Sequence, residues 1–475
     1  MGGLSVLCAR RKPTSFSWWS FSLPAFSWRY PLFPPFFLPL RGKNPSTAQF
    51  CNWLRPIKEF LFSADFAARA RLTPAAFTRQ RELPLPHLVG LLLNLRKGSL
   101  QEEVNGFWEV LTGQPLAIGV SAAALCKARQ QLDPDALWAL NERLLGSFAQ
   151  AFPLRRWHGL RVLATDGSTL RLPRSPAVSA HFGAPPSGST IPLGRLSQLV
   201  DVLNGVVVDA ELDAYDVGER VLASEHLEAT APQDLVLYDR GYPAFWLFAR
   251  HYQLERDFCA RLPLGFSTEV TAFLASGARS AVITLAPSPE ARRQCQRYEI
   301  PTAPIPVRLI RVTLADGETE VLATSLLAEP AWPSVWFKGL YHLRWGAEEA
   351  YKRDKLRLEL ENFSGLSVRV VLQDCFAKRF TLNLTAICAW VAQAIATERF
   401  RQRRRDYRVN FAHALSCMKN TVVRLLVGAD TTELLMSLIL AMAMTVEAVR
   451  PDRSFPRNMK PAKLQGFHRS YKRCR

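Results

Sequence analysis

The stretch YHLRWGAEEAYKRDKLRLELENFSG, residues 341–365, carries the most informative spacing in this chain. If the stretch is helical, each residue advances by about 100° around the axis. Four polar side chains then share one stripe, within roughly 60° of one another; they are Tyr341, Arg344, Glu348 and Lys355. An adjacent apolar stripe, suited to packing on a sheet, consists of Trp336, Leu340, Leu343, Ala347 and Ala350. The pattern predicts a helix with one buried face and one face that offers a carboxylate among positive charges.

A plain solvated helix with one i,i+4 ion pair, worth about a few tenths of a kcal/mol, would show part of this pattern. Two aspartates upstream favour a functional site instead. The segment LRVLATDGSTLRLP (160–173) is apolar and β-rich up to Asp166, and DLVLYDRGYPAFWLF (234–248) repeats the arrangement at Asp239. Each aspartate is predicted to end a strand at the rim of an α/β sheet, where such folds bind ligands. An N-cap or turn role is the alternative at either position.

Asp166, Asp239 and Glu348 together supply three hard oxygen ligands of the kind that Mg²⁺ or Mn²⁺ prefers. Without a cation, three adjacent carboxylates would repel one another and raise one another's pKa. A divalent ion, or a pair of them, removes this repulsion and supplies chemistry.

The pattern DG…DxGY…YxxRxxxExxxxxxK, within residues 60 to 400, resembles the catalytic signature of the IS4 family of DDE transposases. These are bacterial insertion-sequence enzymes with an RNase H-like core. The resemblance implies an α/β fold: a mixed sheet flanked by helices, an N-terminal helical domain, and a β-rich insertion before the last catalytic helix. It assigns the three acids to a catalytic metal-binding triad that holds Mg²⁺ or Mn²⁺, expected as two ions. It further implies that Tyr341, Arg344 and Lys355 contact phosphates at the transposon end.

The implied function is cut-and-paste DNA transposition. The protein would bind terminal inverted repeats of double-stranded DNA as a dimer, then cleave the DNA and transfer the cut strand to target DNA. It would be cytoplasmic and associated with a bacterial nucleoid. The chain departs from its relatives in one respect, because they support a flipped base with a tryptophan in the β insertion. Residues 262–330 contain no Trp, and the nearest are Trp332 and Trp336, so a hairpin step does not carry over.

Two other functions stay open from the sequence. One is a catalytically silent, transposase-derived DNA-binding protein, and the other is a nuclease of the same fold without strand transfer. A basic membrane-surface protein is disfavoured, because no amphipathic basic helix dominates. The longest apolar stretch, Leu434 to Val446, is too short to cross a bilayer, so no spanning segment is expected.

Composition agrees with a nucleic-acid partner. The 475 residues leave room for two or three domains, and 60 Lys and Arg against 41 Asp and Glu give a formal charge of +19. Ribosomal and membrane-surface proteins share such an excess. Nine cysteines without a CxxC pair and eight histidines without HExxH spacing argue against a zinc site or a disulfide framework, and fit a reducing cytoplasm.

Six regions are expected along the chain. They are a low-complexity leader at 1–45, a helical DNA-binding domain at 46–157, the first part of the core at 158–262, the β-rich insertion at 263–330, the last part of the core with the motif helix at 331–400, and a basic helical C-terminal region at 401–475. The leader holds five prolines between residues 24 and 39. It is expected to be disordered or to precede the true translation start.

The region 46–157 shows local helix signals. Ser99 with Glu102 predicts a capping box, and Asp133 before Pro134 predicts another helix start. A helix-turn-helix-type DNA reader is the favoured interpretation, and an all-helical packing domain with a wet basic face is the alternative. The basic residues that such a reader would use include Arg69, Arg71, Arg79, Arg81, Arg96, Lys97, Lys127 and Arg129. In the core, Asn204-Gly205 predicts a hairpin with a type I′ turn.

Overall fold

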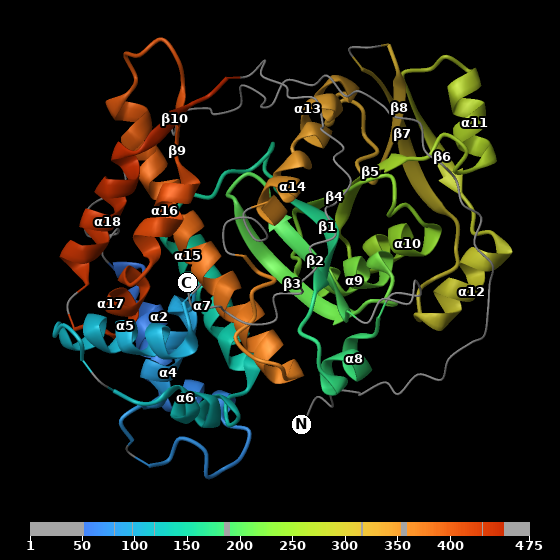
Figure 1. Ribbon diagram of the computed structural model, residues 1–475. Coiled ribbons are helices and arrows are strands. Elements are labelled where there is room, and N and C mark those ends of the chain that lie inside the picture. The colour runs from blue at the N-terminus through green and yellow to red at the C-terminus, as the bar shows by residue number, and fades with distance from the viewer. Residues whose placement is uncertain are drawn as a thin grey trace. The chain divides into compact units, whose positions relative to one another are not determined.

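The computed structural model describes residues 52–79, 81–96, 98–117, 119–184, 191–314, 317–352, 359–429 and 431–450. Its central feature is an eight-stranded mixed sheet in the order β3-β2-β1-β4-β5-β8-β7-β6 (Figure 1). The strands are β1 (Arg161–Arg171), β2 (Leu193–Asp201), β3 (Val206–Ala214), β4 (Asp234–Tyr238), β5 (Asp257–Leu262), β6 (Ser280–Leu285), β7 (Ile305–Thr313) and β8 (Thr319–Thr324).

The first five strands have the RNase H-like arrangement. β1, β2 and β3 pair antiparallel, β4 runs parallel to β1, and β5 runs parallel to β4. Helix α9 (Glu219–Glu225) lies between β3 and β4 in the chain, and helix α10 (Phe245–Gln253) lies between β4 and β5. All five residues of β4 are buried, as expected for a central parallel strand covered on both faces. The predicted mixed α/β sheet flanked by helices is confirmed.

The segment between β5 and the motif helices continues the same sheet. β8 pairs antiparallel with β5, and β7 and β6 follow outward. The sequence predicts only short strands here, yet helices α11 (Thr268–Ala275) and α12 (Pro289–Arg297) lie among them. Their starts are marked in the sequence, because Ser267 and Ser288 cap them through hydrogen bonds from Val270 N and Ala291 N.

The β2–β3 hairpin is present, but the predicted type I′ turn is wrong. Residues 202–205 connect the strands, and Gly205 alone among them has a positive φ, of 72°. Asn204 is instead 3% exposed, and its Nδ2 donates to Asp201 Oδ1 and Oδ2 at 3.0 and 2.9 Å. Nδ2 also lies 3.1 Å from the carbonyl oxygen of Arg155. This tertiary contact, absent from the local pattern, selects the longer turn.

Helices from both ends of the chain share one apolar core. They are α2 (Arg55–Leu61), α3 (Ala64–Ala70), α4 (Leu85–Asn94), α5 (Leu100–Thr112), α6 (Ala122–Arg129), α7 (Pro134–Ala151), α15 (Val368–Arg399), α16 (Phe411–Met418), α17 (Thr421–Val427) and α18 (Thr432–Met444). The Ser99–Glu102 capping box and the Asp133 cap before Pro134 are both confirmed. Because α15 packs against α4, α7 and α18, and α17 packs against α4, the N-terminal and C-terminal helical regions stabilise each other.

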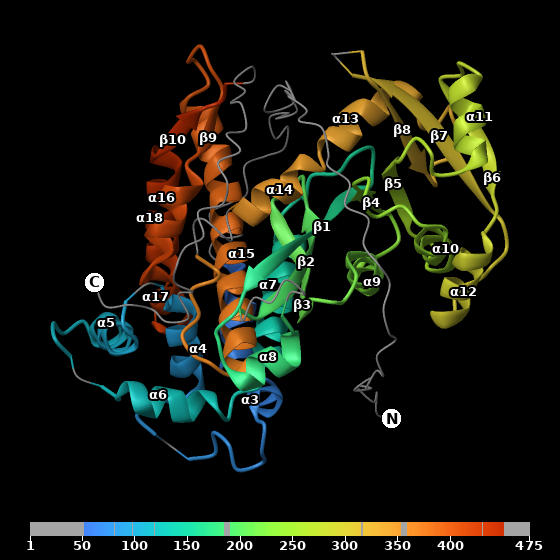
Figure 2. The same ribbon diagram turned by 45° about the vertical axis from the view of Figure 1, so that its right-hand side comes forward.

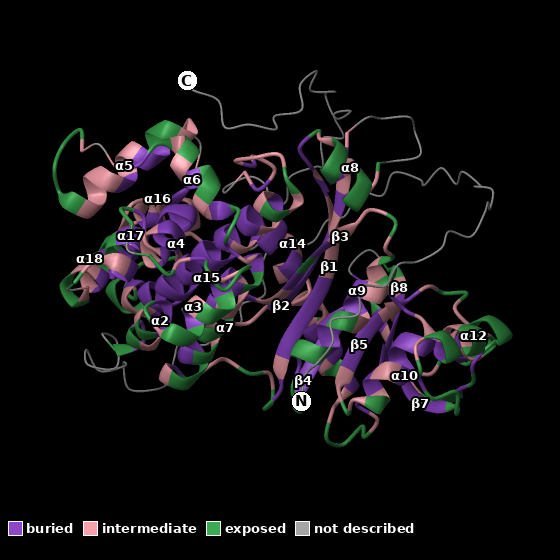
Figure 3. Ribbon diagram, turned by 90° about the horizontal axis from the view of Figure 1, so that it is seen from below, coloured by how far each residue is buried: buried purple, intermediate pink, exposed green. Residues whose placement is uncertain are grey.

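The 32-residue helix α15 is long and apolar enough to span a membrane, so the expectation that no segment has that length is wrong. Its most apolar stretch is 78% buried inside the protein. Figure 3 shows most of this helix in the colour of buried residues. The apolar composition of α15 is accounted for by its packing against α7, α18 and α4.

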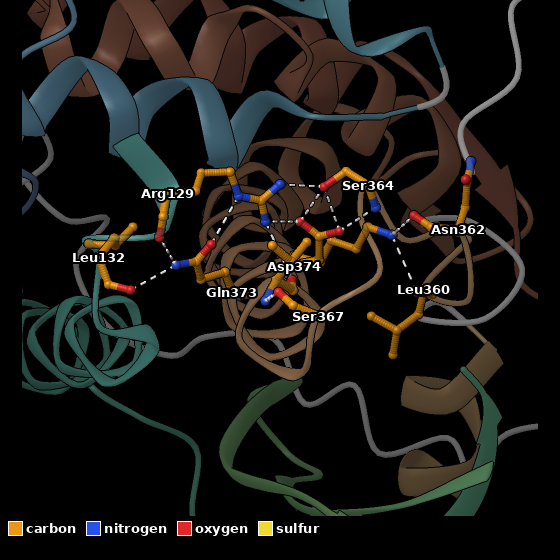
Figure 4. A network of polar contacts seen from close by, with 10 residues as sticks. Arg129, Leu132, Leu360, Asn362, Ser364, Ser367, Gln373 and Asp374 are labelled. Atoms are coloured by element: carbon orange, nitrogen blue, oxygen red, sulfur yellow. Dashed lines mark hydrogen bonds and ion pairs between the residues drawn. The ribbon is translucent and has the colours of Figure 1, made fainter. Parts of the chain in front are cut away.

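A buried polar network joins α6, the start of α15 and the segment that precedes α15 (Figure 4). Arg129 Nη2 and Asp374 Oδ1 form an ion pair at 2.7 Å, with side chains 2% and 4% exposed. Arg129 Nε donates to Gln373 Oε1 at 2.9 Å, and the Ser364 N–H donates to Asp374 Oδ2 at 2.6 Å. Arg129 is therefore an internal residue. The prediction that it belongs to the cations that contact DNA is wrong. By contrast, Arg69, Arg79, Arg81 and Lys127 are exposed.

Candidate active site

The motif stretch forms two helices rather than the single helix that the spacing predicts. α13 (Phe337–His342) ends, and α14 (Trp345–Lys352) begins, around Leu343 and Arg344. Four i→i+3 hydrogen bonds tighten the chain at this point, from the N–H groups of Leu343, Arg344, Gly346 and Ala347. Because residues three apart eclipse each other in such a turn, the tightening aligns Tyr341 with Arg344. On the predicted apolar stripe, Leu340, Ala347 and Ala350 are buried, whereas Trp336 and Leu343 are half-buried.

Helix α14 packs on β1 and β2 (Figures 1 and 2). A Cβ at Gly346 would lie 3.1 Å from Val202 Cβ, so glycine allows the close approach. The Tyr351 hydroxyl lies 2.8 Å from the carbonyl oxygen of Asp166 and 3.1 Å from that of Leu196. Tyr351 is thus a positioning residue that the sequence analysis missed. Its place three residues after Glu348, near the same helix face, is the signal that could have indicated it.

Asp166 does not end its strand, which corrects the prediction. β1 continues to Arg171 because Leu163 to Arg171 pair with β2. On its other side, the parallel pairing with β4 stops at Ala164 opposite Leu237. If this register is continued by two residues beyond Ala164 and Leu237, Asp166 lies opposite Asp239. Asp239 is the residue that follows the end of β4. The two aspartates are therefore neighbours at the carboxyl end of β4.

The electrostatics show that the predicted acids share one region. Burial raises the pKa of Asp166 to about 6; Arg344 and the Gly167 N–H oppose the rise, and the charges of Asp239 and Glu348 add to it. Arg344 Nη2 donates to Glu348 Oε1 at 2.9 Å, and these two side chains are 15% and 24% exposed. A single arginine therefore offsets the charge of acids that come from β1, the end of β4 and α14.

No three acidic, histidine or cysteine side chains within the described residues lie close enough together to hold a metal ion. Each acid has a partner instead: Asp166 Oδ1 accepts from Gly167 N at 3.0 Å, Asp239 Oδ1 accepts from Gly241 N at 2.7 Å, and Glu348 pairs with Arg344. The donor set still fits a hard divalent cation, because it consists of carboxylate oxygens in a part-buried region where their mutual repulsion is not fully offset.

The remaining predicted contacts are placed only in part. Tyr341 is half-buried on α13, and burial raises the pKa of its hydroxyl, an effect that Arg344 opposes. Lys355 lies outside the described residues. The structure therefore gathers five of the six predicted side chains, namely Asp166, Asp239, Tyr341, Arg344 and Glu348.

The two tryptophans nearest to the β insertion are engaged in stacking. Trp332 stacks on Trp157 with ring centroids 5.6 Å apart, and Trp336 stacks on His158 at 3.8 Å. Both contacts are made by the residues just before β1. Trp157 also contacts Phe337, the first residue of α13, edge-on at 6.1 Å, so these rings hold the start of α13 near the start of β1.

Comparisons with known proteins agree with this geometry. Residues 157–384 match the family model described as Transposase DDE domain. The transposase InsG for insertion sequence element IS4 of Escherichia coli (strain K12) is 25% identical over 291 residues, which are 59% of this chain and 64% of that protein. The putative transposase InsZ of the same strain is 24% identical over 126 residues, 26% of this chain and 42% of that protein. The chain thus spans less than two thirds of the length of either relative.

A cryo-EM structure of a piggyBac transposase synaptic complex with hairpin DNA is similar over 84% of this chain and 85% of that one, with a TM-score of 0.41 and 10% identity. The matched family model covers β1 to β8, both motif helices and the first half of α15, so this part of the chain is a transposase DDE domain. With its YxxRxxxE motif, this domain is similar to that of InsG, the transposase of an IS4 element.

The raised pKa of Asp166 predicts an effect of Asp166→Asn on stability without metal. For an acid whose pKa is raised on folding, the stabilisation by its proton is complete below its unfolded pKa and is lost as pH rises through the folded value, about 6 here. In EDTA, Asp166→Asn should therefore raise the Tm above that of the wild type at pH 7.5 and change it little at pH 4. Thermal denaturation at both pH values measures this, with the exposed Asp216→Asn as control. A difference in Tm that is the same at both pH values would contradict it.

Proposed function

We propose that the protein is the transposase of an insertion sequence, which binds terminal inverted repeats of double-stranded DNA and catalyses metal-dependent cleavage and strand transfer. The observation that carries the proposal is the convergence of Asp166, Asp239 and Glu348 from three elements of the DDE domain. A dimer on two transposon ends, in the cytoplasm of a bacterium and at its nucleoid, completes the proposal.

In this function the three acids would hold Mg²⁺ or Mn²⁺. When bound, divalent ions lower the pKa of a water and stabilise a leaving oxygen in phosphoryl transfer. Asp166 and Asp239 are already neighbours, so they form the fixed half of the site. Glu348 has to exchange its partner Arg344 before it can join them.

DNA supplies the reason for that exchange. A phosphate offers Arg344 two oxygens in place of one carboxylate oxygen, and arginine binds phosphate well in this geometry. The half-buried Tyr341, on the same side as Arg344, would donate a hydrogen bond to a neighbouring phosphate oxygen. Lys355 would add positive charge. Phosphate binding by Arg344 would thus release Glu348 where the cation is needed, and couple correct DNA binding to assembly of the site.

A cleavage assay tests the proposal. Purified full-length protein is given the DNA that flanks its own gene, with and without Mg²⁺, beside an Asp239→Ala control. Metal-dependent cuts at the inverted-repeat ends, followed by joining to a second DNA, are expected from the wild type alone. Cutting without joining would indicate a nuclease of this fold, and binding without cutting a silent descendant.

A further inference from the structure

β1 extends beyond its parallel neighbour, which leaves part of its edge without a paired strand. The pairing with β4 ends at Ala164, whereas the pairing with β2 continues to Arg171. The edge of β1 at Asp166 and Gly167 therefore faces the residues that follow β4. Because successive side chains of a strand point to opposite faces, groups from both faces of the sheet can meet at this edge.

The carboxylate of Glu219, the first residue of α9, lies over Gly167. A Cβ at Gly167 would meet Glu219 Cδ at 2.8 Å and Oε1 at 3.0 Å, so only glycine leaves the carboxylate undisturbed there. Glu219 Oε1 accepts a hydrogen bond from Arg195 Nη1 at 2.8 Å, and the Glu219 side chain is 40% exposed. A fourth carboxylate is thus over Gly167, the residue that follows Asp166, and it is partly accessible to solvent.

Tyr242, in the DxGY motif after β4, is tied to Asp239 by a hydrogen bond from its N–H to the Asp239 carbonyl oxygen at 3.3 Å. Its side chain is among the fully buried ones, and its hydroxyl oxygen has no hydrogen-bond partner within the described part of the chain. Burial raises the pKa of Tyr242, and the charges of Glu219, Asp166 and Asp239 raise it further. The hydroxyl therefore lies in the field of carboxylates from β1, α9 and the end of β4.

The unpaired hydroxyl needs a physical reason, because burying a hydroxyl without a partner is costly. Its neighbour Tyr238 shows the usual solution: its ring tilts against that of Tyr242 at 5.6 Å, and its hydroxyl lies 2.9 Å from His251 Nε2. A buried polar atom without a protein partner usually bonds to an ordered water or an ion. Around Tyr242, three negative charges favour a cation with its water.

We propose that Glu219 and the Tyr242 hydroxyl form a further part of the divalent-cation site, with Glu219 as a fourth carboxylate and Tyr242 as a partner of the cation's bound water. The inference rests on the proposed function, which requires the cation. Mg²⁺ and Mn²⁺ take oxygen ligands, and Mg²⁺ keeps several waters, so a second rim of oxygen groups suits them. In the metal-free protein, the hydrogen bond from Arg195 keeps the Glu219 carboxylate over Gly167.

The test is MnCl₂ binding to the metal-free, full-length protein, measured by isothermal titration calorimetry without DNA. Glu219→Gln is expected to weaken Mn²⁺ binding by about tenfold or more. Arg195→Met is the matched control, because it breaks the same ion pair but keeps the carboxylate and removes a competing positive charge. It should leave Mn²⁺ binding unchanged or tighter. If Glu219 serves only as the partner of Arg195, the two variants will change together.

Tyr242 is tested by thermal denaturation with and without MnCl₂. Tyr242→Phe removes an unpaired hydroxyl, so the metal-free Tm should stay the same or rise, while the increase in Tm caused by Mn²⁺ becomes smaller. Tyr238→Phe should lower the metal-free Tm, because it removes a hydroxyl that is paired with His251. The increase in Tm caused by Mn²⁺ should stay as in the wild type. A loss of metal-free stability in Tyr242→Phe with an unchanged response to Mn²⁺ would show a structural role only.

The failure of this inference can be told apart from failure of the proposed function. If Asp166→Asn abolishes Mn²⁺ binding while Glu219→Gln and Tyr242→Phe bind as the wild type does, the further inference is overturned and the proposed function stands. If the wild type binds no Mn²⁺, both are overturned.

Discussion

Glu348→Gln is expected to slow DNA cleavage by at least about 10³-fold, the scale seen when one member of a catalytic set is removed. The amide keeps the shape of the side chain but loses the negative charge that a divalent cation requires. It also weakens the contact with Arg344, which lies 2.9 Å from Glu348 Oε1. Because Arg344 becomes freer to meet phosphate, DNA affinity should be kept or increased. Single-turnover cleavage and fluorescence anisotropy on the same DNA measure the two quantities.

The neighbouring Glu349→Gln is the matched control on the same helix, since its side chain points about 100° away from that of Glu348. It should cleave at close to the wild-type rate. Normal cleavage by Glu348→Gln would show that the assignment of the third acid is wrong. Equal loss in both variants would instead indicate a defect of α14 as a whole.

Asp374→Asn is expected to lower the free energy of unfolding by about 3–5 kcal/mol, because it leaves the Arg129 charge buried without its counter-ion. The pair is 2% and 4% exposed, so water cannot replace the lost carboxylate. The Ser364 N–H, which donates to Asp374 Oδ2, loses part of its acceptor as well. Equilibrium unfolding in urea at pH 7 measures the change.

The exposed pair Arg55–Glu59 supplies the control, with side chains 73% and 61% exposed. Glu59→Gln should cost no more than about 0.5 kcal/mol, as is usual for surface pairs one helical turn apart. If both variants unfold at the same urea concentration, the buried network contributes no more than a surface contact. A double variant, Arg129→Met with Asp374→Leu, should recover most of the loss, because it leaves no unpaired charge.

Local signals were enough to predict several elements and to single out candidate site residues that lie near one another. The Ser99–Glu102 box and the Asp133 cap depend on residues three or fewer apart, and both form as predicted. The buried strand Asp234–Tyr238 can be recognised in the sequence, because it is a short apolar run bounded by a turn. The spacing of Tyr341, Arg344 and Glu348 indicated one shared face, and these side chains do share a charged region with Asp166 and Asp239.

Other features depended on contacts between residues far apart in the chain. Asp166 was expected at the end of a strand, but its pairing with β2 carries β1 onward to Arg171. In the sequence, Arg129 does not differ from the exposed cations near it. Its ion pair with Asp374, which comes 245 residues later in the chain, makes it an internal residue. The Asn204 side chain is held by the carbonyl oxygen of Arg155, 49 residues earlier, and this contact cannot be predicted from the Asn-Gly pair.

The sequence by itself thus determined the sheet-and-helix class and the likeness to DDE transposases, and it selected the candidate acids, because caps, hydrophobic periods and motif spacing act over a few residues. The tertiary structure alone decided that Asp166 lies level with Asp239 and that the Glu219 carboxylate covers Gly167. It also decided that the Tyr242 hydroxyl is buried without a partner among the described residues. Strand register and burial are set by long-range packing, and no local pattern encodes which distant side chain will fill a given space.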